Sequence, residues 1–231
     1  MNKNAIVTGA NGNLGKAVVN KLLSAGFQVI GTVHNDQPTD QSEEHPKFEK
    51  YKLDVTDEQA TQQFVNYAVN KFENIHYAAL LVGGFGMNSF EDTTLGEVHN
   101  MFKLNFESAF ITSQALYKQM KQQSSGGKIT FIGAKPALEK GASKGLTAYA
   151  LSKSLIFKLA EHINAEGNEH RIYASVIVPS IIDTPFNREG MPDAEFSKWV
   201  SPDQIGDISA FLAEDISTPL RDPIIKVYGD S

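Results

Sequence analysis

Ala5-Ile6-Val7-Thr8-Gly9-Ala10-Asn11-Gly12-Asn13-Leu14-Gly15 is the stretch that decides the fold of this 231-residue chain. A short apolar run, typical of a buried strand, leads directly into a glycine-rich turn, and apolar residues then recur at helical spacing as far as Leu22. Glycine permits positive φ and close backbone approach, and a helix that begins at such a turn presents free N–H groups and a partial positive charge. The stretch therefore predicts a strand, turn and helix that bind the pyrophosphate of a dinucleotide, although a turn made only for packing gives the same pattern.

Strands are expected to alternate with helices along the rest of the chain. Apolar runs predict strands over 27–30, 75–82, 129–132, 172–178 and 224–227, and a further strand is expected over 48–53. Capping pairs predict helices that begin at Thr56/Gln59, Thr94/Glu97 and Ser201/Gln204, the second of them running to about Gln123. Further helices are expected through Tyr149 and over 193–199, and a surface loop over 34–46. This alternation predicts an α/β fold with one domain over residues 1–231, a doubly wound parallel sheet of the Rossmann type with helices on both faces.

Composition narrows the class of protein. Hydrophobic residues make up 41% and charged residues 21% of the chain, which is ordinary for a globular protein. A net charge of −6 argues against a nucleic-acid or anionic-membrane partner. The chain has no cysteine, and its six histidines lack ligand spacing, so we expect no metal site. Without a signal peptide or an apolar run of membrane-spanning length, a cytoplasmic location is expected.

Tyr149 and Lys153 form a candidate proton-transfer pair. They lie four residues apart in an expected helix, which places both side chains on one helical face. Free tyrosine titrates near ~10, so a neighbouring cation is needed to make the phenol useful near neutral pH.

The residues after the second and third strands bear on the dinucleotide. A carboxylate at the end of the second strand would hold the adenosine ribose of NAD, but Val33 stands there, followed by His34. This absence favours NADPH over NADH, and His34 either contacts a phosphate or is an idle surface residue. Asp54, after the third strand, either accepts from the adenine amino group or caps the next helix locally.

These motifs together resemble those of the short-chain dehydrogenase/reductase family. The glycine-rich turn, Leu53-Asp54-Val55, Asn105, the Tyr149/Lys153 pair and Pro179 to Thr184 occur in that family's order over nearly the whole chain, with Gly12 one place earlier than in most members. The resemblance implies an NAD(P)H-dependent oxidoreductase. It implies dinucleotide contacts from Gly9, Asn11, Gly12, Asn13, Leu14, Gly15, His34, Asp54, Val55, Gly83, Gly84, Tyr149, Lys153, Pro179, Ile182 and Thr184.

The resemblance also implies roles at the reacting centre. Tyr149 would donate a proton to the reduced substrate, and Lys153 would hold the nicotinamide ribose and lower the pKa of the phenol. Thr184 would hold the nicotinamide carboxamide. Asn105 would order the helix and a proton-relay water, or serve only as a buried structural amide.

A narrower resemblance is to the dihydropteridine reductases of that family. It is carried by the segments 82–86, 133–138, 148–149, 178–179, 183–188 and 191–199. Phe85 stands where those reductases have a tryptophan, and Val33 replaces their ribose-binding aspartate. The resemblance implies a pterin-like or other conjugated small-molecule acceptor, a lid over about 186–199, and a homodimer or homotetramer. The candidate walls of the substrate pocket are Phe85, Phe186, Met191 and Trp199.

Ala134 is the most informative departure from the wider family, which has a serine there to polarise the substrate carbonyl. Losing one such donor costs typically ~10²–10³ in rate for oxyanion chemistry. Dihydropteridine reductases have the same alanine, because a quinonoid pterin takes hydride into a conjugated ring. Two alternatives remain: a carbonyl or alcohol oxidoreductase in which Ser143, Lys135 or substrate contacts replace the serine, or a dinucleotide sensor without turnover.

Overall fold

A computed structural model describes residues 3–34 and 45–230 of the chain. Most of the loop expected over 34–46, with Asn35 and Asp36, lies outside the described residues. Seven parallel strands form one sheet in the order β3-β2-β1-β4-β5-β6-β7. The strands are β1 Asn4–Thr8, β2 Gln28–Val33, β3 Phe48–Lys52, β4 Tyr77–Leu80, β5 Gly127–Ile132, β6 Ile172–Pro179 and β7 Ile224–Val227.

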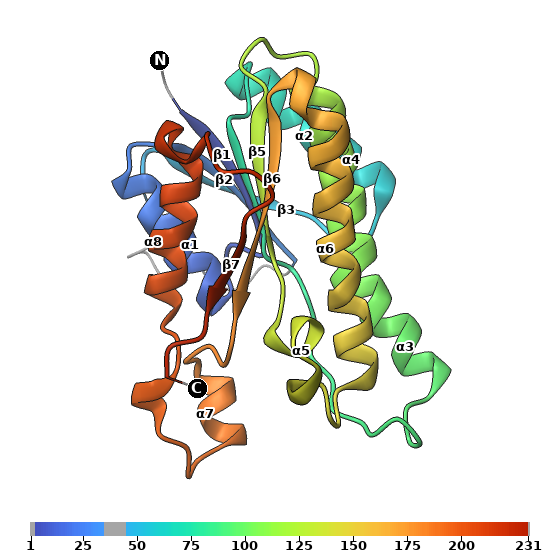
Figure 1. Cartoon of the computed structure of the whole chain (residues 1–231). Coiled ribbons are helices and arrows are strands. Elements are labelled where there is room, and N and C mark those ends of the chain that lie inside the picture. The colour runs from blue at the N-terminus through green and yellow to red at the C-terminus, as the bar shows by residue number, and fades with distance from the viewer. Residues whose placement is uncertain (1–2, 35–44, 231) are drawn as a thin grey trace.

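Helices cover both faces of the sheet (Figure 1). One face carries α1 (Asn13–Ser24) and α8 (Pro202–Ala213), and the other carries α2 (Glu58–Phe72), α4 (Ser108–Met120) and α6 (Thr147–Gly167). This confirms the predicted doubly wound Rossmann-type α/β fold. The shorter helices are α3 Leu95–Phe102, the π-helical turn η2 Lys103–Glu107, α5 Lys135–Leu138, α7 Pro185–Gly190, and the 3₁₀ turns η3 Lys140–Ala142, η4 Asn168–His170, η5 Phe196–Lys198 and η6 Asp215–Ser217.

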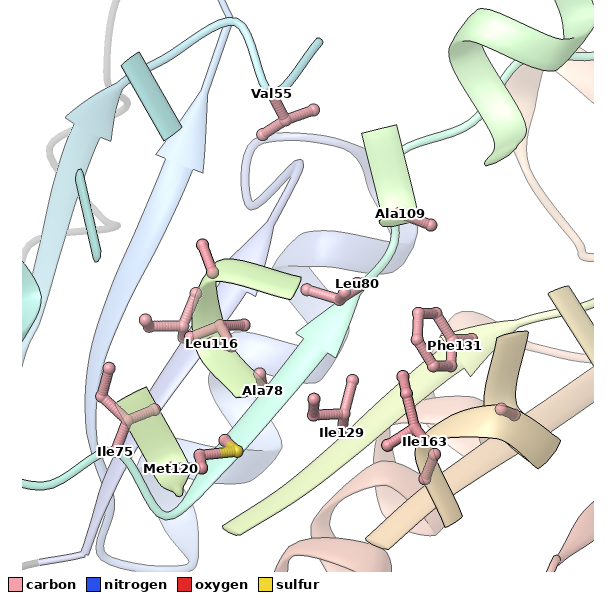
Figure 2. Close-up of a cluster of buried hydrophobic side chains, with 14 of the residues drawn as sticks. Val55, Ile75, Ala78, Leu80, Ala109, Leu116, Met120, Ile129, Phe131 and Ile163 are labelled. Carbon is pink, nitrogen blue, oxygen red and sulfur yellow. The ribbon is translucent and has the colours of Figure 1, made fainter. Parts of the chain in front are cut away.

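The core has two parts, one on each face of the sheet. Successive strand residues point to opposite faces, so in β1 Ile6 packs toward one side while Ala5 and Val7 pack toward the other. Figure 2 shows the larger cluster, in which Leu116 and Met120 of α4 lie against Ala78 of β4. Central strands such as β1 and β4 are buried along their whole length, which explains why their sequences are largely apolar.

The order of the strands reverses beside β1, and this positions the site. The chain adds β2 and β3 on one side of β1 and β4 on the other, so the glycine-rich turn emerges between two diverging connections. Thr8 Oγ1 accepts from the Leu81 backbone N–H at 2.9 Å, and Thr32 Oγ1 accepts from that of Gly9 at 3.3 Å. These bonds fix the turn against the carboxyl ends of β2 and β4.

Three local predictions need correction. The Thr56/Gln59 capping box is wrong, because the Asp57 side chain accepts from the Ala60 N–H at 2.9 Å and caps α2. The single helix expected from Thr94 is interrupted by the π-helical turn η2, although its capping box is confirmed, as is the one at Ser201/Gln204.

The helix expected over 193–199 is only the 3₁₀ turn η5, and a helix forms earlier, at α7. The signals for α7 are in the sequence, since Thr184 caps it and Pro185 occupies its first position.

Candidate functional site

The glycine-rich turn has the shape of an anion cradle. Gly9 has φ +69°, and a Cβ at Gly15 would lie 2.1 Å from the Gly9 carbonyl oxygen, so both positions require glycine. Gly12 is the N-cap residue of α1, and no side chain caps this helix. Its first N–H groups are therefore not bound by a capping side chain, which is the arrangement that binds phosphate groups at helix N-termini.

Asn105 joins the loop after β4 to the helix that carries Tyr149. Its side chain accepts from the Gly84 N–H at 2.9 Å and donates to the Gly84 carbonyl oxygen at 3.1 Å and to Ser152 Oγ at 3.0 Å. The π-helical turn that contains Asn105 aims this amide inward, and such turns occur often at functional sites. Gly83 permits the approach, because a Cβ there would lie 2.5 Å from Asn105 Oδ1 and 3.1 Å from Lys153 Nζ.

Lys153 is buried, with 6% of its surface exposed. Its Nζ donates to the carbonyl oxygen of Ile132, the last residue of β5, at 2.9 Å. Burial disfavours the ammonium form and lowers the pKa of Lys153 to about 8. Near neutral pH the side chain still carries its charge, held at the carboxyl end of the sheet.

Tyr149 is partly buried in the first turn of α6, and its ring meets that of Phe85 edge-on, with centroids 5.0 Å apart and planes at 70°. Burial raises the pKa of Tyr149 to about 12. The expected lowering by Lys153 is absent here, since burial is the cause of the shift and the Lys153 ammonium bonds to Ile132. A phenol with this pKa keeps its proton at neutral pH, so the proton is present for donation, but its transfer is less favourable than from a phenol whose pKa lies nearer neutral.

The residues predicted to meet the adenosine lie beside the glycine-rich turn. Asp54 Oδ1 accepts from the Thr56 N–H at 2.9 Å and from Thr56 Oγ1 at 2.7 Å, which lowers the pKa of Asp54. The local capping role considered for Asp54 is thus present. Val33 and Val55 are buried in the core, whereas His34 is exposed at the end of β2.

The segment after β6 is anchored at its base. Ile182 pairs with Val200 in a β-bridge, and Arg188 donates to both oxygens of Asp183 at 2.6 and 2.7 Å. Thr184 Oγ1 accepts from the Asn187 N–H at 3.2 Å, so its own proton is available to another acceptor.

The four candidate pocket walls divide into two kinds. Phe85, Phe186 and Met191 are exposed, as a wall facing a substrate would be. Trp199 is only 7% exposed and packs against Phe196 of its own segment, with ring centroids 4.9 Å apart and planes tilted at 56°.

Ser143 and Lys135, the candidate replacements for the missing serine, both make other contacts. Ala134 is buried at the end of β5 and presents a methyl group. Ser143 Oγ donates to the Lys140 carbonyl oxygen at 2.9 Å, and Lys135 Nζ lies over the ring of Tyr228, 4.9 Å from its centroid.

Ser152 is a site residue that the sequence did not reveal. It is fully buried, accepts from Asn105 and donates to the Tyr149 carbonyl oxygen at 2.8 Å. Its only signal was its place between Tyr149 and Lys153, and a helical serine commonly bonds to its own backbone without further consequence.

Two further features of the described residues bear on the class of protein. None of the described helices is long and apolar enough to cross a membrane. Within 3–34 and 45–230, no group of three or more His, Asp or Glu side chains could hold a metal ion.

The fold, the cradle and the Tyr149/Lys153 pair define a dinucleotide-binding oxidoreductase. Residues 3–195 match the family model described as short chain dehydrogenase. The chain belongs to this family. The match confirms the predicted enzyme class, an NAD(P)-dependent oxidoreductase of the short-chain dehydrogenase/reductase type.

Individual relatives are distant but span the whole chain. An L-rhamnose 1-dehydrogenase (NAD(P)(+)) of Sphingomonas sp. is 26% identical, with 98% of this chain and 95% of that protein covered. A dihydropteridine reductase of Dictyostelium discoideum is also 26% identical, with 98% and 94% covered. The crystal structure of gox2181 superimposes with a TM-score of 0.91 at 25% identity, covering 99% of this chain and 95% of that one.

Proposed function

We propose that this protein is an NAD(P)H-dependent reductase of a conjugated, pterin-like acceptor. The observation that carries the proposal is Ala134, a buried alanine two residues after Ile132, whose carbonyl oxygen accepts from Lys153. Reduction of an ordinary carbonyl places negative charge on one oxygen, so a fixed hydrogen-bond donor at that oxygen increases the rate strongly. A conjugated ring spreads that charge, so the same site without the donor suits it better.

The chain's residues supply binding, orientation and a proton. When bound, the nicotinamide supplies the hydride. Gly9, Gly12 and the first N–H groups of α1 would hold the pyrophosphate, and Lys153 the nicotinamide ribose. The Thr184 hydroxyl would donate to the carboxamide. The Tyr149 hydroxyl would give its proton to the reduced acceptor and regain one from water.

The exposed aromatic side chains support a flat, conjugated acceptor. Phe85 and Phe186 are 52% and 71% exposed and belong to the two segments expected to flank the substrate. Packing an exposed aromatic ring against a planar ring system is favourable, because it removes apolar surface from water. A sugar, by contrast, has no planar conjugated ring on which these side chains could stack.

A second candidate is the oxidation of a sugar or other alcohol, favoured by the resemblance to L-rhamnose 1-dehydrogenases. Against it stand the missing serine and the present bonding of Ser143 and Lys135. A sensor without turnover has no use for a proton donor.

A panel of acceptors separates these functions. We expect NADH or NADPH to be oxidised rapidly with a quinonoid dihydropterin and at least ~10²-fold more slowly with simple aldehydes and ketones. Efficient oxidation of L-rhamnose with NAD(P)⁺ would favour the second candidate. Tight dinucleotide binding without turnover on any of these substrates would favour the sensor.

For the dinucleotide we propose a preference for NADPH, because no carboxylate ends β2 and His34 is exposed there. Replacing His34 by glutamate should weaken NADPH binding relative to NADH by about tenfold, since it places a negative charge near the 2′-phosphate. Fluorescence titration with each dinucleotide measures the ratio. His45→Glu, the same change at the opposite end of the sheet, is the control, and an equal loss for both dinucleotides with His34→Glu would contradict the proposal.

We also propose that the protein forms a homodimer or homotetramer through α4 and α6. Their outer faces enclose a shallow groove of about 220 Å³ lined by Phe110, Tyr117, Leu159 and neighbouring side chains. The ring of Phe106 lies beside that of Phe110, with centroids 6.0 Å apart. A second copy meeting this apolar face would cover it on both subunits at once.

Phe110→Lys should therefore convert the oligomer into smaller species, because it places charge in the centre of this contact. Sedimentation velocity measures the change. Phe211→Lys on α8, similarly exposed, tests a different face. An unchanged mass with Phe110→Lys would contradict the assignment of α4 and α6.

A further inference from the structure

Phe85 connects the loop after β4 to the proposed proton donor. Its ring lies edge-on to the ring of Tyr149, at 5.0 Å between centroids, while half of its own surface remains exposed. Edge-to-face contact is a favoured geometry between aromatic rings. Phe85 therefore restricts the orientation of the Tyr149 ring without being part of the core.

The backbone that carries Phe85 is fixed on one side. Gly84 is held at both its N–H and its carbonyl by Asn105, and a Cβ at Gly84 would lie 2.8 Å from Leu104 Cδ1. Gly86 is less confined, since a Cβ there would find only Met101, at 3.6 Å or more. The backbone of Phe85 is thus positioned mainly by the preceding residue, Gly84.

The Asn105 side-chain amide is also linked to Tyr149, the residue whose ring contacts Phe85. Asn105 Nδ2 donates to Ser152 Oγ, which donates to the carbonyl oxygen of Tyr149. Asn105 therefore fixes the distance between the loop that carries Phe85 and the first turn of the helix that carries Tyr149.

We propose that Phe85 is a positioning residue, and that Asn105, through Gly84 and Ser152, holds its ring where it keeps the Tyr149 hydroxyl oriented for proton donation. The inference rests on the proposed function, in which Tyr149 gives the proton. A ring without this neighbour turns more freely about its side-chain bonds, so the phenol spends less time in the productive orientation.

The test compares Phe85→Leu with Phe85→Trp. We expect Phe85→Leu to lower kcat at saturating acceptor by about tenfold and to increase the solvent deuterium isotope effect on kcat, because proton transfer becomes slower. Phe85→Trp, which restores an aromatic edge, should recover most of kcat and return the isotope effect to its original value. The dinucleotide dissociation constant should stay within about twofold in both variants. Phe90→Leu, an 86% exposed residue of the same loop, is the matched control.

Two results would overturn the inference. If Phe85→Leu raises only KM and leaves kcat and the isotope effect unchanged, Phe85 contributes to substrate binding alone and does not position Tyr149. If kcat and dinucleotide affinity fall together, the change has disturbed the loop as a whole. Tyr149→Phe, measured in parallel, distinguishes failure of this inference from failure of the proposed function. Full turnover in Tyr149→Phe would show that Tyr149 is not the proton donor, independently of the role of Phe85.

Discussion

Tyr149→Phe is expected to lower turnover by about 10²–10⁴-fold, the range typical of a lost general acid. The ring and its edge-on contact with Phe85 remain, so only the hydroxyl and its proton are removed. The dissociation constant for NADPH should stay within about twofold, because the cradle of α1 and the Lys153 ammonium are unchanged. Steady-state oxidation of NADPH with a quinonoid dihydropterin, together with fluorescence titration, measures both quantities.

Tyr67→Phe is the matched control for this prediction. Tyr67 lies on α2, where its hydroxyl bonds to Glu49 on β3, far from the carboxyl ends of the strands. Removing that hydroxyl should leave turnover unchanged. Turnover by Tyr149→Phe equal to that of the parent enzyme would show that another group supplies the proton.

Lys153→Met is expected to make the protein less active and more stable at the same time. A buried ammonium costs free energy, and methionine has a similar length without the charge. We expect turnover to fall by roughly 10²-fold or more, with weaker binding of the dinucleotide. The free energy of unfolding, measured in urea without added dinucleotide, should rise by about 1–3 kcal/mol.

The pH dependence of stability identifies the cause of that gain. The pKa of Lys153 is about 8 in the folded chain and 10.5 is its ordinary value, so between these pH values the unfolded chain binds the extra proton. The folded state of the parent protein therefore gains stability as pH rises from about 8 to 10.5, by at most ~1.36 kcal/mol for each step of one in pH. The advantage of Lys153→Met should shrink over this range.

Lys158→Met tests the specificity of this effect. Lys158 lies on the same helix but is exposed and paired with Glu161. Its replacement should change stability by less than about 0.5 kcal/mol. A Lys153→Met protein that is less stable than its parent at pH 7 would show that the bond to Ile132 outweighs the cost of burial.

The fold was predictable because its signals are local and agree with one another. The apolar run of β1, the glycines that allow the turn, and the capping boxes at Thr94 and Ser201 each depend on a few neighbouring residues. The cap of α2 was misplaced by one residue because Thr56 and Asp57 are both good capping residues. Thr56 bonds instead to Asp54, which leaves Asp57 to cap the helix.

The proximity of the candidate site residues was predictable, but their electrostatics were not. Residue types and order suggested Asn105, Tyr149 and Lys153, yet the expected lowering of the Tyr149 pKa did not occur. Helical spacing places two side chains on one face, but it does not say whether a long lysine side chain meets the phenol or a strand carbonyl. The π-helical turn at Asn105 depends likewise on tertiary packing, and so does the burial of Trp199 against Phe196.

A crystal structure of the protein with bound NADPH tests the central claim most directly. We predict that the nicotinamide ring lies beside the Tyr149 hydroxyl, with Lys153 Nζ within hydrogen-bond distance of the attached ribose. The pyrophosphate should contact the first N–H groups of α1. A dinucleotide bound elsewhere, or a Tyr149 hydroxyl turned away from the nicotinamide, would contradict the assignment of this pair as the reducing centre.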